Sequence, residues 1–274
     1  MRDFHRHHNE VSGFTLIELA VVVVVIALLL GALLIPLSKQ IEQRNVSDTQ
    51  QRLAQIQDAL IAFAIAQGRF PCPADAASGS GAEAFIGGGT AATGVCANPN
   101  PNVGFFGGYV PGTTLGLTNL DSQGFALDAW GLTQNRIRYA IIDANVNGVT
   151  HAFTKTGGMS AAGIQGLANP SNTYLYVCAS ASVITNSACS GLPLGTPDPN
   201  ALARGDAVFV IFSLGKNAAT TSPGGPDEQA NLSIYPRFVS KVASDQAGNE
   251  YDDLMLWASR YVVIGRLVSA GQLP

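Results

Sequence analysis

The most constraining feature of this chain is an apolar run near its N-terminus that one carboxylate interrupts. Residues 13–36 read GFTLIELAVVVVVIALLLGALLIP, and Glu18 is the only charged residue among them. From Leu19 to Leu37 there are 19 residues without a charge. In an α-helix they extend over about 28 Å, close to the roughly 30 Å hydrocarbon core of a bilayer. The sequence therefore predicts a membrane-spanning helix that begins beside a carboxylate.

The segment before this run differs from an ordinary secretory signal, which is cut after its apolar stretch. Thirteen mostly polar residues, MRDFHRHHNEVSG, end in Gly13. The motif Gly13-Phe14-Thr15-Leu16-Ile17-Glu18 that follows resembles the G-F-T-L-I-E processing site of type IV prepilins and pseudopilins. The resemblance implies that residues 1–13 are a leader peptide. It also implies that a prepilin peptidase cuts between Gly13 and Phe14 and methylates the new amine of Phe14.

The position of Glu18 calls for a physical explanation, because a charge inside an apolar membrane helix raises the free energy of insertion by about 2.5–3.5 kcal/mol on insertion scales. The resemblance implies that its carboxylate neutralises the N-terminal amine of a neighbouring subunit in a growing filament. The alternative is a lone glutamate that reaches the membrane interface in a simple anchor. The six-residue match favours the pairing role, which makes Glu18 an assembly residue.

Beyond the apolar run the sequence stays helical but becomes amphipathic. Apolar residues recur at the spacings of one helical stripe, and these are Val46, Leu53, Ile56, Leu60 and Phe63. Gly68, followed by two prolines, gives a stop signal. We therefore expect one spine helix over residues 14–67, with a membrane-spanning half at 14–37 and an amphipathic half at 38–68.

Residues 69–274 predict one globular head, and the whole chain an α+β fold. Charged residues make up only 12% of the chain, and 30 Gly and 14 Pro suit long ordered loops. Runs rich in Val, Ile, Tyr and Phe predict strands at 136–143, 173–179, 207–214 and 237–242. The spacing of Trp257, Tyr261, Ile264 and Val268 predicts a C-terminal helix. The expected architecture is a long spine helix packed on a mostly antiparallel sheet with long loops.

The four cysteines all follow the apolar segment, and an even number in an exported head predicts two disulfides. Three pairings are possible. Cys72–Cys96 and Cys178–Cys189 are favoured because both close local loops. A zinc site is the rival interpretation, but there is no C-x-x-C pair and only His151 follows the leader.

Short motifs in the head resemble those of type II secretion pseudopilins. They are Phe70-Pro71, Asp128-Ala129-Trp130-Gly131, Ser213-Leu214-Gly215, and Asp252-Asp253 ahead of Trp257. In the major pseudopilins a calcium ion braces the loop after S-L-G, which nominates Asp227, Asp252 and Asp253 as oxygen ligands. The corresponding loop here, KNAATTSPGGPDEQANLS, lacks the acidic pattern of that family. We therefore expect no metal and no other cofactor.

Catalysis and nucleic-acid binding are both disfavoured. Ser/His/Asp chemistry would have to use His151, and the chain has no G-x-S-x-G elbow. Asp252 and Asp253 are adjacent, and adjacent residues of a strand point to opposite faces. The net charge of −4 gives no electrostatic basis for binding nucleic acid. We expect no enzyme and no catalytic residues.

These features predict a pilin-like structural subunit, a pseudopilin or minor pilin. It would assemble through its N-terminal helix into a type II secretion pseudopilus or a type IV pilus. The expected partners are prepilin peptidase, other pilin or pseudopilin subunits, the inner-membrane assembly platform and membrane lipid. The expected location is the bacterial inner membrane, single-pass with a periplasmic head, and then a periplasmic or surface filament. The alternatives are a tip adhesin or specificity subunit and a simple membrane-anchored envelope protein.

Overall fold

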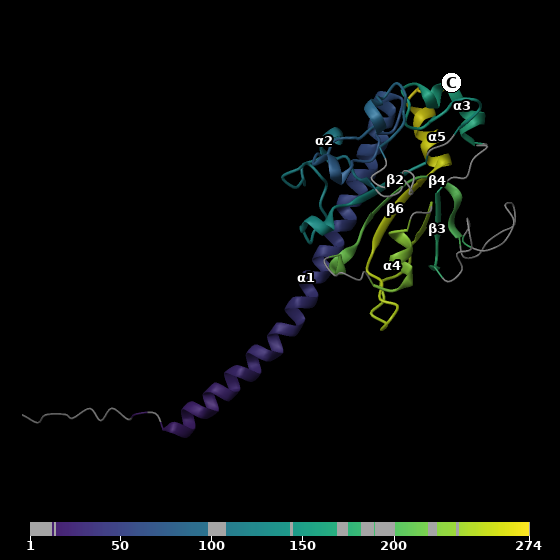
Figure 1. The fold of residues 1–274 in the computed structure, drawn as a ribbon. Coiled ribbons are helices and arrows are strands. Elements are labelled where there is room, and N and C mark those ends of the chain that lie inside the picture. Colours follow the sequence, from purple (N-terminus) through teal and green to yellow (C-terminus); the bar gives the residue numbers. More distant parts are fainter. Residues whose placement is uncertain are drawn as a thin grey trace, which may run out of the picture. The chain divides into compact units, whose positions relative to one another are not determined.

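The computed structural model describes the chain in several stretches. These are residues 13, 15–97, 108–142, 145–168, 175–181, 189, 201–218, 224–233 and 236–273. Of residues 32–37, 201 and 203–205 only the backbone is described. The chain divides into two compact units, Met1–Arg44 and Asn45–Pro274. The second unit contains the later part of the long helix and the whole head (Figure 1).

Helix α1 runs from Leu16 to Gln67 as one element, close to the expected range 14–67. In the first unit its apolar side chains are exposed, from Leu16 at 87% to Leu30 at 57%. Among the helical side chains that the structure describes, no stretch is long and apolar enough to cross a membrane.

The described residues therefore do not show the membrane-spanning half expected at residues 14–37. The described part of the uncharged run, Leu19–Gly31, has 13 residues, whereas a span requires about 20. Residue 14 and the side chains of residues 32–37 lie outside what the structure describes.

The later part of α1 is amphipathic, as expected, because one stripe packs on the head. Leu53, Ile56, Leu60 and Ala64 are at most 3% exposed, and their spacing of three or four residues places them on one helical face. Gly68 ends the helix in the left-handed conformation with φ of 66°. Its N–H donates to the carbonyl oxygen of Ala64 at 2.9 Å, which is typical of a glycine at a helix C-terminus.

The head is built on a mixed sheet with the strand order β1-β2-β4-β3-β5, in which β6 also pairs with β4 (Figure 1). The strands are β1 (Gly108–Tyr109), β2 (Arg138–Ile141), β3 (Leu175–Cys178), β4 (Ala201–Ser213), β5 (Arg237–Val239) and β6 (Leu254–Ser259). Among the described residues only β3 and β5 pair in parallel. The expectation of a mostly antiparallel sheet is confirmed, although β4 begins six residues before the predicted position.

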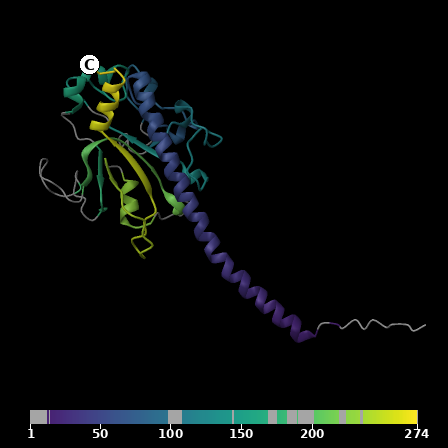
Figure 2. The ribbon, with the colours of Figure 1, turned by 180° about the vertical axis from the view of Figure 1, so that it is seen from behind.

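Alternating side chains of the central strands form two apolar layers, as the two-residue period of a strand requires. Tyr139 and Ile211 belong to the cluster that contains the buried stripe of α1. Ala140 and Val210 belong to a second cluster with Phe238 of β5. Figure 2 shows the later part of α1 lying across the face of the sheet.

The remaining helices are short. They are α2 (Gly112–Leu115), α3 (Gly158–Ala168), α4 (Pro226–Asn231) and α5 (Arg260–Ser269), with single 3-10 turns at Ala76–Ser78, Ile86–Gly88, Thr133–Asn135 and Gly215–Asn217. The predicted C-terminal helix around Trp257 is wrong at its start, because Trp257 lies in β6 opposite Val210 of β4. Helix α5 begins only after Ser259, whose side chain accepts the N–H of Val262 as a helix N-cap.

Candidate functional site

The segment expected to be processed lies just before α1. Gly13 is described, whereas Phe14 and residues 1–12 of the expected leader lie outside the described residues. A Cβ atom placed on Gly13 would meet no atom within 4 Å. Packing within the described chain therefore does not explain why glycine stands at this position.

Thr15 and Glu18 form a reciprocal cap at the first turn of α1. The backbone N–H and the hydroxyl of Thr15 donate to Oε2 of Glu18 at 2.9 and 2.8 Å, and the N–H of Glu18 donates to Oγ1 of Thr15 at 3.3 Å. The carbonyl of Thr15 accepts the N–H of Leu19 at 3.2 Å, so Thr15 is the N-cap. This is the Thr-x-x-Glu capping box. Sequence reasoning missed it, although the four-residue pattern is a readable signal.

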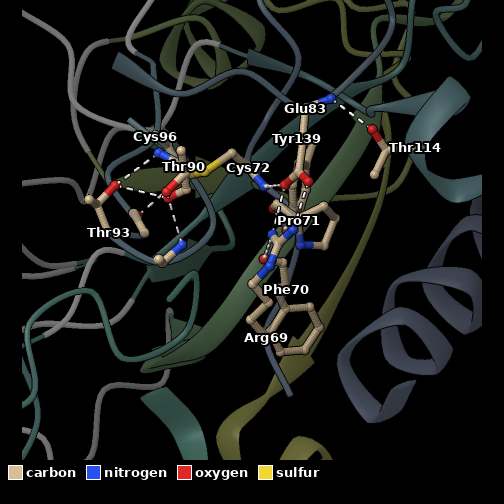
Figure 3. Close-up of polar contacts among 12 residues, drawn as sticks. Arg69, Phe70, Pro71, Cys72, Glu83, Thr90, Thr93, Cys96, Thr114 and Tyr139 are labelled. Carbon is tan, nitrogen blue, oxygen red and sulfur yellow. Dashed lines mark hydrogen bonds and ion pairs between the residues drawn. A yellow bond between two sulfur atoms is a disulfide. The ribbon is translucent and has the colours of Figure 1, made fainter. Parts of the chain in front are cut away.

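The structure contains two disulfides, Cys72–Cys96 and Cys178–Cys189, which are the pairs that the sequence favoured. Each has a Cα–Cα distance of 5.2 Å, and all four cysteines are buried. The first disulfide ties the chain just after α1 to the loop that returns past Glu83 (Figure 3). It therefore holds a glycine-rich segment that has few regular elements of its own.

Three carboxylates of the head form a second candidate site, called the carboxylate cluster. They are Glu228 in the first turn of α4 and Asp252 and Asp253 just before β6. One carboxylate oxygen of each residue lies within 4.8 Å of those of the other two. The expectation that Asp252 and Asp253 point to opposite faces of a strand is wrong, because both residues precede β6. The backbone outside the strand lets both carboxylates turn toward α4.

Asp227, which the family resemblance nominated as a metal ligand, does not belong to the cluster. Its carboxylate accepts hydrogen bonds from the hydroxyl of Ser180 at 3.0 Å and from the N–H of Ala181 at 2.6 Å. It also forms an ion pair with Lys241. Consecutive helical residues point about 100° apart, so Asp227 and Glu228 face different surroundings.

Burial dominates the electrostatics of the carboxylate cluster. Glu228 is fully buried and Asp253 is 5% exposed. Burial, and next the charge of Glu228, raise the pKa of Asp252 to about 7, and burial raises the pKa of Asp253 well above its ordinary value. Oδ1 of Asp252 and Oδ1 of Asp253 are buried without a hydrogen-bond partner among the described residues. Gly215 leaves room for the Asp252 carboxylate, because a Cβ there would lie 2.4 Å from Oδ1 of Asp252.

These groups fit a calcium ion. Calcium takes about six to eight oxygen ligands, with carboxylates prominent among them, and buried carboxylate oxygens that accept no hydrogen bond are groups that a cation would satisfy. Glu228, Asp252 and Asp253 would hold the ion. Asn217, whose amide donates to Oε2 of Glu228 at 2.7 Å, would orient that carboxylate. The expectation of a chain without a metal stays a prediction, which calcium titration tests.

Calcium is expected to raise the thermal midpoint of the purified protein. A cation that binds the folded cluster and not the unfolded chain stabilises by mass action, by about 2.7 kcal/mol at 100 times Kd. Calorimetry in calcium and in chelator measures the difference. Glu228→Gln should lose the response, whereas Asp245→Asn, which alters an exposed carboxylate outside the cluster, should keep it. Equal wild-type midpoints in calcium and in chelator would remove the calcium assignment.

Comparison with known families gives one match, at the N-terminus. Residues 9–34 match the Prokaryotic N-terminal methylation motif, the leader signature of type IV pilin-like prepilins. The match includes Gly13, Phe14, Thr15 and Glu18 and stops before the head. Comparisons with curated proteins and with solved structures give no significant match to this chain.

Proposed function

We propose that this protein is a pilin-like structural subunit, a pseudopilin or minor pilin, without catalytic activity. It assembles through its N-terminal helix into a type II secretion pseudopilus or a type IV pilus. The observation that carries this proposal is the methylation motif at residues 9–34, which includes the exposed apolar side chains from Leu16 to Leu30 of α1. A helix with such a surface needs a lipid or protein partner.

The features of the N-terminal segment support processing by a prepilin peptidase. No described atom lies near a Cβ placed on Gly13, and we assign the constraint on this residue to processing. A peptidase that binds extended backbone supplies it, because a side chain next to the cut bond would obstruct binding. The product carries a methylated amine on Phe14, and Glu18 pairs with that amine on a neighbouring subunit.

The head supports an exported location. Two buried disulfides are typical of proteins that fold in an oxidising compartment such as the periplasm. We therefore place the precursor in the bacterial inner membrane, anchored by its N-terminal helix, with the head in the periplasm. Its partners there are the assembly platform, membrane lipid and other pilin-like subunits.

Replacing Gly13 by leucine is expected to block processing, so that unprocessed precursor becomes the predominant form. Mass spectrometry of the wild-type protein should find methylated Phe14 at the N-terminus. Gly31→Leu is the matched control, because a Cβ at Gly31 also meets no atom within 4 Å yet lies far from the cut. A wild-type chain that starts at Met1, or that is cut beyond the apolar run, would contradict the proposed function.

A further inference from the structure

The capping box at the start of α1 uses the two oxygens of Glu18 unequally. Both donors of Thr15, its backbone N–H and its hydroxyl, reach Oε2 at 2.9 and 2.8 Å. No hydrogen bond to Oε1 comes from the part of the chain that the structure describes. The carboxylate is thus held through Oε2, and Oε1 can still accept a hydrogen bond.

We propose that Thr15 is a positioning residue for subunit assembly. Its hydroxyl holds Oε2 of Glu18, and this leaves Oε1 to accept an N–H from the N-terminal amine of a neighbouring copy. The inference rests on the proposed function, in which Glu18 and that amine form a pair. It adds a second residue to the interaction and assigns a separate role to each carboxylate oxygen.

The hydroxyl and the amine do not compete for the carboxylate. An ionised carboxylate offers about four lone-pair sites on two oxygens, so Thr15 can remain bound while the amine arrives. Without the hydroxyl, the Glu18 carboxylate keeps only the backbone N–H of Thr15, and its remaining freedom would have to be lost at the moment of binding. Ordering one side chain costs binding about 2- to 13-fold, which corresponds to roughly 0.5–1.5 kcal/mol.

The competing explanation is that Thr15 only caps the helix. The two roles differ in their chemical requirements. An N-cap tolerates glycine with little loss of helix stability, whereas valine is a poor cap. Positioning requires the hydroxyl, which serine retains and which both glycine and valine lack. Serine, glycine and valine at this position therefore separate the two roles.

The experiment measures the fraction of processed subunit that is incorporated into sheared filaments, with the full-length chain at native expression. Thr15→Ser is expected to match the wild type, and Thr15→Gly and Thr15→Val to fall by about 2- to 13-fold. If Thr15→Gly is incorporated almost normally and only Thr15→Val loses incorporation, Thr15 acts as a helix cap alone and the inference is overturned. Wild-type incorporation in both variants would also overturn it.

Glu18→Gln, measured in the same assay, separates this inference from the proposed function. Loss of incorporation in Glu18→Gln supports the assembly pair, whatever the Thr15 variants do. If Glu18→Gln assembles normally, or if processed wild-type protein enters no filament, the proposed function fails and the inference fails with it.

Discussion

Replacing Asp128 by alanine is expected to destabilise the head by roughly 3 kcal/mol or more. Asp128 is fully buried and accepts four hydrogen bonds. The amide of Asn135 and the N–H of Trp130 donate at 2.9 Å, the N–H of Gly131 at 3.3 Å, and the hydroxyl of Ser213 completes the set. Each buried donor left without an acceptor costs about 1–3 kcal/mol.

The loss of stability should be large because the turn that follows Asp128 joins three parts of the second unit. Thr49 of α1 accepts the N–H of Ala129 at 3.1 Å, and Arg52 of α1 donates to the carbonyls of Leu127 and Asp128. On the other side, Ser213 ends the central strand β4. Burial raises the pKa of Asp128, and the hydrogen bonds it accepts act against that increase.

Urea unfolding of the full-length protein, followed by tryptophan fluorescence, measures the loss, because Trp130 lies two residues from the substituted position. Asp128→Asn should cost less, since its carbonyl still accepts the two backbone N–H groups. Asp58→Ala, which changes an exposed carboxylate on α1, should stay within about 0.5 kcal/mol. An Asp128→Ala protein as stable as Asp58→Ala would show that water replaces the carboxylate without cost.

The parts of the fold that were predictable are those set by local pattern. The apolar stripe through Leu53 and Leu60 and the stop at Gly68 define α1, because helix periodicity and a glycine C-cap depend on neighbouring residues alone. The β-branched runs located β2 and β3 within two residues at each end. Trp257 was misplaced because Trp257, Tyr261 and Ile264 fit a helical spacing, and only pairing with β4 selects a strand.

The candidate sites also divide into residues that a local motif predicts and residues that only the packing of the chain brings together. Gly13, Phe14 and Glu18 belong to one continuous motif, so the sequence was sufficient to nominate them. In the carboxylate cluster the resemblance nominated Asp252 and Asp253 but not Glu228, because Glu228 meets Asp252 across 24 residues through the packing of α4. The choice of Glu228 over Asp227 depends on the direction in which each helical residue points, and the sequence does not contain that direction.

The ion pair between Arg69 and Glu83 is expected to show the second large effect. Two nitrogens of the Arg69 guanidinium donate to the two oxygens of Glu83 at 2.7 Å each, and the N–H of Cys72 also donates to Glu83 at 3.2 Å. The guanidinium lies 5.2 and 5.8 Å from the ring centroids of Phe63 and Phe85. Figure 3 shows this pair beside the Cys72–Cys96 disulfide.

Glu83→Ala should lower the free energy of unfolding by about 3–5 kcal/mol, because it leaves a buried guanidinium without its counter-charge. The side chains of Arg69 and Glu83 are only 7% and 16% exposed, so water reaches them poorly. The double variant Arg69→Met/Glu83→Leu should be more stable than Glu83→Ala alone. Replacing both members of a buried ion pair by apolar groups is often neutral.

The exposed pair between Lys216 and Asp245 is the matched control, with side chains 41% and 83% exposed. Asp245→Ala should cost at most about 1 kcal/mol, the usual range for a surface ion pair. Urea unfolding of all three variants makes the comparison under oxidising conditions, so that the disulfides stay intact. If Glu83→Ala and Asp245→Ala lose the same stability, or if the double variant is the least stable of the three, burial of the Arg69 charge is not the cause.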